Sequence, residues 1–107
     1  MLEQIEQLLS APALGADAPT LARMEDTLTE GYAQALALEA ERWRLERRLG
    51  EVARTLEGPD VSRFADELIS LAKRITSADG ELMQLRTLLG TLYERARSMR
   101  VAGQKTI

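Results

Sequence analysis

The sequence predicts an all-α fold: a long antiparallel two-helix coiled-coil hairpin preceded by a short N-terminal amphipathic helix. Three observations favour this fold. Two long segments repeat apolar residues with the seven-residue period of a coiled coil. The connection between them is short and contains Gly-Pro, so the two helices must run antiparallel. The composition is rich in the helix formers Leu, Ala, Glu and Arg and poor in aromatic residues. We predict one helical domain over residues 1–107.

Residues 1–11 are predicted to form the short helix. Its apolar stripe consists of Leu2, Ile5, Leu8 and Leu9. Such a helix is too short to be stable alone, so it must pack on another element. Residues 12–17 predict a linker because they are small and include proline and glycine. Asp17 is the expected N-cap of the following helix, with Pro19 in its first turn.

The first long helix is predicted over residues 18–57. Its seam positions are Leu21, Met24, Leu28, Gly31, Ala35, Leu38, Arg42, Leu45, Leu49, Val52 and Leu56. Gly31 and Arg42 are the two that lack an apolar side chain. A single polar seam residue often fixes helix register at some cost in stability. We interpret Arg42 this way, opposite Ile75 and Ala78, with its stem crossing the seam to reach water; a functional arginine is the alternative.

The second long helix is predicted over residues 61–102, after a turn at residues 58–60 and before a tail at residues 103–107. Its twelve seam positions are all apolar: Val61, Phe64, Leu68, Leu71, Ile75, Ala78, Leu82, Leu85, Leu89, Leu92, Ala96 and Met99. Asp79-Gly80 is the weak point of this helix. Because the heptad passes through it in phase, we expect one bent or soft helix, with a true break as the alternative.

Antiparallel pairing also predicts contacts between charged residues. Across one groove, the expected ion pairs are Arg48 with Glu67 and Glu41 with Arg74. The short helix is expected at the open end of the hairpin, where Arg95, Arg97 and Arg100 lie. Glu3 and Glu6 can neutralise these arginines, which also complement a helix dipole. An anionic partner site is the alternative.

A second apolar face is predicted on the other side of the hairpin. Its proposed interface residues are Tyr32, Leu36, Trp43, Ile69, Ala72, Met83 and Tyr93, and Ala53 and Ala65 lie beside them. Trp43 stands in the charged stretch ERWRLERR, but each residue advances a helix by about 100°, so its neighbours point elsewhere. A two-helix hairpin cannot bury this face alone, so it predicts a partner surface. We expect a homodimer forming a four-helix bundle; a different helical protein, or partial cover by the short helix, are the alternatives.

Composition argues against several functional classes. The chain has no cysteine and no histidine, which removes thiol chemistry and the commonest general base and metal ligand. We therefore predict no catalytic residues, no cofactor and no metal. The net charge of −3, with acidic and basic residues mixed, argues against nucleic-acid binding. No apolar run approaches the length of a membrane span, and the first residues lack the basic region of a secretory signal, so the cytoplasm is the expected location.

In length and heptad layout, residues 17–102 resemble small bacterial helical-hairpin proteins, including secretion and flagellar export chaperones and a family of secreted hairpins with a Trp-x-Gly turn. Here the turn reads EGPD and Trp43 lies earlier in the chain, so the sequence departs from the turn motif of the latter family. The resemblance implies a hairpin that binds other helices. The sequence thus predicts a non-enzymatic, self-associating scaffold, adaptor or regulatory subunit; the alternative is a chaperone-like carrier of an amphipathic client segment.

Overall fold

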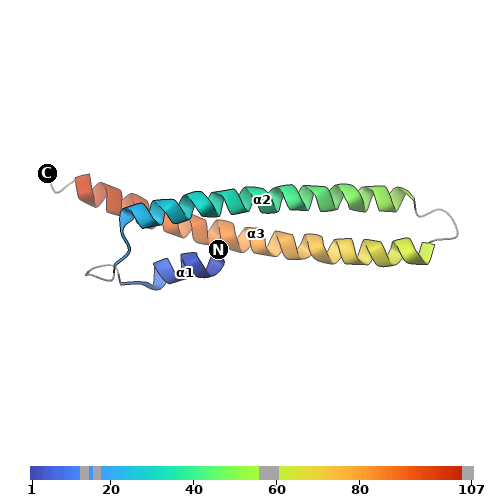
Figure 1. The fold of residues 1–107 in the computed structure, drawn as a ribbon, viewed down its shortest axis with the longest axis horizontal. Helices are drawn as coiled ribbons and strands as arrows, with labels where there is room; N and C mark the ends of the chain where they lie inside the picture. The colour runs from blue at the N-terminus through green and yellow to red at the C-terminus, as the bar shows by residue number, and fades with distance from the viewer. Residues whose placement is uncertain (13–14, 16–17, 56–60, 105–107) are drawn as a thin grey trace. The chain divides into compact units, whose positions relative to one another are not determined.

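The structure is a computed structural model that describes residues 1–12, 15, 18–55 and 61–104. This part of the chain contains three helices: α1 (Leu2–Ser10), α2 (Leu21–Arg54) and α3 (Val61–Gln104). The long helices α2 and α3 pack against each other and run antiparallel, and α1 precedes them (Figure 1). The predicted all-α hairpin with a short N-terminal helix is therefore confirmed.

The chain divides into two compact units. Unit 1 comprises Met1–Ala35 and Gln84–Ile107, so it contains α1 with the beginning of α2 and the end of α3. Unit 2 comprises Leu36–Met83, which contain the rest of α2 and α3. The heptad seam supplies most of the core of each unit, and α1 adds Ile5 and Leu8 to that of unit 1.

The core of unit 1 joins all three helices. Its buried apolar side chains are Ile5, Leu8, Met24, Leu28, Ala35, Leu85, Leu89, Leu92 and Ala96. Gly31 is also buried in this core. A Cβ at this position would overlap with the side chain of Leu89. The exception in the predicted seam thus has a steric explanation: the missing side chain makes room for Leu89.

The core of unit 2 consists of seam residues from α2 and α3. Its buried side chains are Leu38, Leu45, Val52, Leu71, Ala78 and Leu82, and Leu49, Phe64, Leu68 and Ile75 are partly buried. Val61, the first residue of α3, is 46% exposed although the heptad predicted it in the seam. It occupies the end position of the seam, where packing is least complete.

The start of α2 differs from the prediction. The hydroxyl oxygen of Thr20 accepts a hydrogen bond from the backbone N–H of Arg23 at 3.1 Å, which makes Thr20 the N-cap. The helix therefore begins at Leu21, and Pro19 precedes it instead of lying in its first turn. Asp17, the expected cap, lies outside the described residues, as do Leu56 and the turn at residues 58–60.

The helix α3 is continuous through Asp79-Gly80, so the alternative of a true break is wrong. The heptad stays in phase here, and Asp79 makes a contact across the seam that is described below. The helix also extends to Gln104, beyond the predicted end at residue 102. Within the described residues, no helix has an apolar stretch long enough to cross a membrane.

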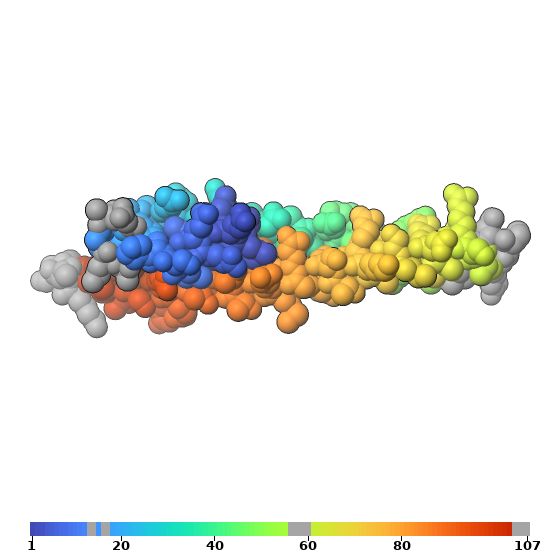
Figure 2. Space-filling model, turned by 90° about the horizontal axis from the view of Figure 1, so that it is seen from below, coloured from blue at the N-terminus to red at the C-terminus, as the bar shows by residue number. Residues whose placement is uncertain are grey.

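The short helix α1 packs on the rest of unit 1 through one face. Ile5 is 0% exposed and Leu8 is 6% exposed, and Figure 2 shows α1 lying over the C-terminal part of α3 and beside the start of α2. Arg95 Nη1 donates a hydrogen bond of 2.6 Å to the carbonyl oxygen of Leu9. The last carbonyls of a helix lack partners within the helix, so Arg95 satisfies one of them.

The arginines near the end of α3 do not pair as the sequence predicted. Arg95 binds the backbone of Leu9, and Arg100 Nη2 lies 2.5 Å from Glu25 Oε1. Glu3 and Glu6 are exposed. The expected neutralisation of Arg95 and Arg100 by these glutamates is therefore wrong, because a carbonyl and a residue of α2 lie nearer to the two guanidinium groups.

Candidate interaction surface

Trp43 is held on the outer side of α2 in unit 2. Its neighbour two positions on, Leu45, turns into the seam and is 6% exposed, whereas Trp43 is 76% exposed. The direction follows from the helical period, because Trp43 lies about 100° around the helix from the seam residue Arg42. The largest apolar side chain of the protein thus faces solvent.

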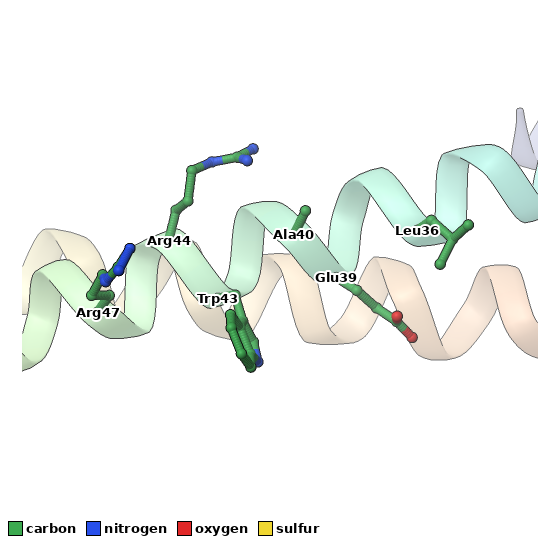
Figure 3. Close-up of a pocket in the computed structure, with 6 residues that line it drawn as sticks. All are labelled: Leu36, Glu39, Ala40, Trp43, Arg44 and Arg47. Carbon is green, nitrogen blue, oxygen red and sulfur yellow. The ribbon is translucent and has the colours of Figure 1, made fainter.

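A shallow depression surrounds the Trp43 indole. It is lined by Leu36, Glu39, Ala40, Trp43, Arg44 and Arg47, all from α2. Figure 3 shows Trp43 between Glu39 and Arg47 along the helix, with Arg44 extending in the opposite direction from the indole. Because one helix supplies every lining residue, this is an open surface suited to another protein and not an enclosed pocket for a small molecule.

The seven predicted interface residues are all exposed. In unit 2, Leu36 is 67% exposed, Ile69 56% and Met83 71%, and Ala72 is also exposed. In unit 1, Tyr32 and Tyr93 are each exposed by 47%. Exposure makes these side chains available to a partner, but the identity of the partner stays a prediction.

Arg42 has a partner that the sequence reading missed. Its Nη1 donates a hydrogen bond of 2.9 Å to Asp79 Oδ1, and its Nε lies 3.8 Å from Glu46 Oε1. The Nε atom is buried and has no hydrogen-bond partner. The hydrogen bond and the charge of Asp79 raise the pKa of Arg42, so the guanidinium stays protonated. The predicted pairing had placed Ala78 opposite Arg42, one residue from the actual partner.

This pair suits a structural role for Arg42 within the seam. The side chain of Arg42 is 32% exposed, and that of Asp79 is 45% exposed, so the ion pair lies at the edge of the seam. The charge of Arg42 is balanced by Asp79 within unit 2. This ion pair argues against a role for Arg42 in binding a separate anionic ligand. The predicted role in fixing the register is consistent with this contact.

One of the two predicted cross-helix ion pairs is confirmed. Arg48 Nε donates a hydrogen bond of 2.9 Å to Glu67 Oε1, and Arg48 Nη2 lies 2.9 Å from the same oxygen. The hydrogen bond to Glu67 raises the pKa of Arg48. Glu41 and Arg74 line one surface groove of unit 2, but the described residues show no ion pair between them. Exposed pairs of this kind contribute little to stability, so they mainly favour one pairing of the helices.

The described residues do not gather polar groups inside the protein. None of their buried side chains is polar or charged. Among them there is also no group of three or more acidic side chains that could hold a metal ion. The feature of unit 2 that stands out is therefore its exposed apolar surface with charged residues at the margin.

Comparisons of the chain with family models, with curated proteins and with solved structures found no match. The functional proposal below accordingly rests on the residues of the chain itself.

Proposed function

We propose that this chain is a non-enzymatic interaction protein that self-associates into a homodimer. The dimer would form through the Trp43 surface, by which we mean five exposed apolar side chains of unit 2: Leu36, Trp43, Ile69, Ala72 and Met83. The observation that carries the proposal is the 76% exposure of Trp43 in a unit whose core consists of apolar seam residues. As a dimer, the protein would serve as a scaffold, an adaptor or a regulatory subunit in the cytoplasm.

Physical chemistry supports a partner for this surface. Large exposed apolar patches on a folded protein mark sites of association, because burying them releases water from apolar surface. Tryptophan is among the residues that contribute most to such interfaces, since its ring brings about 150–250 Å² of surface at little cost in side-chain entropy. A second copy is the favoured partner because most soluble oligomers are symmetric homo-oligomers, most often dimers.

The test is the mass in solution of the wild type and of Trp43→Ala, measured by light scattering over a concentration series. We expect a wild-type dimer of twice 11.9 kDa, and a Trp43→Ala variant that stays monomeric at the same concentrations. Val101→Ala is the control, because Val101 is an exposed apolar residue of unit 1 outside the Trp43 surface. This control should dimerise as the wild type does.

Two results would contradict the proposal in different ways. Equal dimerisation of the wild type and Trp43→Ala would show that another surface forms the interface. A wild type that stays monomeric at every concentration and binds a hydrophobic dye would favour the carrier hypothesis, in which the same surface holds an amphipathic segment of a client protein.

A further inference from the structure

Two residues of opposite charge lie at equal distances from Trp43 along α2 in unit 2. Glu39 lies four residues before Trp43, and Arg47 lies four residues after it. At about 1.5 Å and 100° per residue, each lies about 6 Å from Trp43 along the helix axis and about 40° around it, on opposite sides. Both side chains line the depression around the indole (Figure 3). One end of this surface is therefore negative and the other positive.

Such an arrangement is complementary to itself. Consider a second copy of α2 that packs antiparallel on the first, with a two-fold axis that passes between the two Trp43 residues. A residue a given number of positions before Trp43 in one copy then lies level with the residue the same number of positions after Trp43 in the other copy. Glu39 of one copy then lies level with Arg47 of its partner, and the symmetry produces this pair twice. A parallel arrangement would bring Glu39 beside Glu39 and Arg47 beside Arg47, which like-charge repulsion disfavours.

The shape of the surface follows the same symmetry. Leu36 lies seven residues before Trp43, and Gly50 lies seven residues after it, which places each about 10 Å from the axis and within about 20° of Trp43 around the helix. Leu36 is 67% exposed. A Cβ built on Gly50 would lie 3.8 Å from Arg54 Nη2. The protruding Leu36 of one copy therefore lies level with Gly50 of the other, which has no side chain of its own and is contacted by the side chain of Arg54.

We propose that two copies of the chain associate through antiparallel packing of α2 on α2, centred on Trp43 and paired by Glu39 with Arg47 of the partner subunit. This inference rests on the proposed self-association and adds its orientation and register. The two indoles meet at the axis, an ion pair stands on each side, and Leu36 lies level with Gly50 of the partner subunit at each end.

Charge reversal tests the pairing. In Glu39→Arg, two arginines face each other at both symmetric positions, and in Arg47→Glu, two glutamates do. We expect each single variant to dimerise about tenfold more weakly than the wild type, or weaker still. A mixture of the two variants restores both opposite-charge pairs in a heterodimer, so the mixture should associate about as tightly as the wild type. The double variant Glu39→Arg/Arg47→Glu should restore the homodimer.

Two further variants are matched controls. Arg63→Glu makes the same charge change as Arg47→Glu at an exposed residue of α3 that does not line the depression, and Glu41→Arg makes the same charge change as Glu39→Arg on the far side of α2. Both should leave the dissociation constant within about threefold of the wild type. Sedimentation equilibrium of each protein and of the mixture gives the dissociation constants, and circular dichroism checks that every variant remains helical.

The outcomes separate this inference from the proposed function. A wild type that does not dimerise overturns both. A wild-type dimer whose affinity neither single reversal changes leaves self-association in place but overturns the register. Single variants that weaken the dimer without recovery in the mixture or in the double variant also overturn it, because their effect then arises within one chain and not between Glu39 and Arg47 of two copies.

Discussion

Gly31 illustrates how one residue of the seam is determined by the residue opposite. Glycine is unfavourable in a helix interior, because it loses more backbone freedom on folding than any other residue. At this position, however, a side chain would occupy the space of Leu89, which is itself 1% exposed. Glycine is retained in α2 because it allows close packing.

This explanation predicts opposite effects at two glycines of unit 1. Gly31→Ala should lower the free energy of unfolding by about 1–2 kcal/mol, because Leu89 must move within a packed core. Gly90→Ala is the matched control on α3: Gly90 is exposed and a Cβ there meets nothing within 4 Å, so the same change should stabilise by about 0.5–1 kcal/mol. Urea denaturation measures both. Stabilisation by Gly31→Ala equal to that of Gly90→Ala would show that Leu89 does not fill this space.

Residues also show where sequence reasoning succeeds and where it does not. The heptad identified most of the buried residues, because a period of seven is visible in the sequence and directly sets which side faces the partner helix. It did not identify Asp79 as the partner of Arg42. Asp79 lies beside the seam and not in it. A polar side chain at such a position looks like any other surface residue. Its pairing with Arg42 can be inferred only when the register of the two helices is known to within one residue. The expected pair of Glu41 and Arg74 has the same register as the confirmed pair of Arg48 and Glu67, so the register does not explain why the described residues show no ion pair between them.

At the scale of elements, the continuity of α3 follows from packing. Asp79-Gly80 reads locally as a turn, yet Ala78 and Leu82 on either side are buried, at 7% and 1% exposure. Because these residues keep the seam in phase, tertiary contacts outweigh the weak local preference. The sequence predicted the seam and the continuity of the heptad. The N-cap at Thr20 was missed, because Asp17 and Thr20 are both favourable N-cap residues and the sequence alone does not select between them.

The helix α1 depends on its docking. A helix of nine residues does not form stably alone, so it requires the burial of Ile5 and Leu8 and the hydrogen bond from Arg95 to Leu9. Ile5→Ala removes part of the most completely buried side chain of α1, and truncations of this kind in cores cost about 2–5 kcal/mol. We therefore expect α1 to undock in this variant, while α2 and α3 remain paired.

Hydrogen exchange measured peptide by peptide distinguishes this local effect from global unfolding. In Ile5→Ala, amides of residues 2–10 should lose protection, while those of the buried parts of α2 and α3 keep it. Gln4→Ala, at an exposed position of the same helix, should leave all protection unchanged. Loss of protection across α2 and α3 in Ile5→Ala would instead mean that α1 is necessary for the stability of the hairpin.

At the scale of the whole molecule, the sequence was sufficient for the fold but not for the function. Two long heptad segments with a short connection allow essentially one arrangement, which is why the hairpin was predictable. Binding surfaces lack such a constraint, because an exposed apolar residue looks the same whether it meets a second copy, a client or solvent. What the structure adds is the extent of the exposure of Trp43 and the depression around it that Leu36, Glu39 and Arg47 help to line, from which a specific dimer can be proposed.

The most direct test of self-association through Trp43 is the fluorescence of this residue over a concentration series. The chain contains a single tryptophan, so its emission reports on this position alone. We predict that the emission of the dilute protein is that of a solvent-exposed indole, and that it shifts to shorter wavelength as concentration rises, in parallel with the increase in mass from 11.9 kDa to twice that value. A mass that doubles without any shift would place the interface away from Trp43, and an emission and a mass that both stay constant would contradict self-association itself.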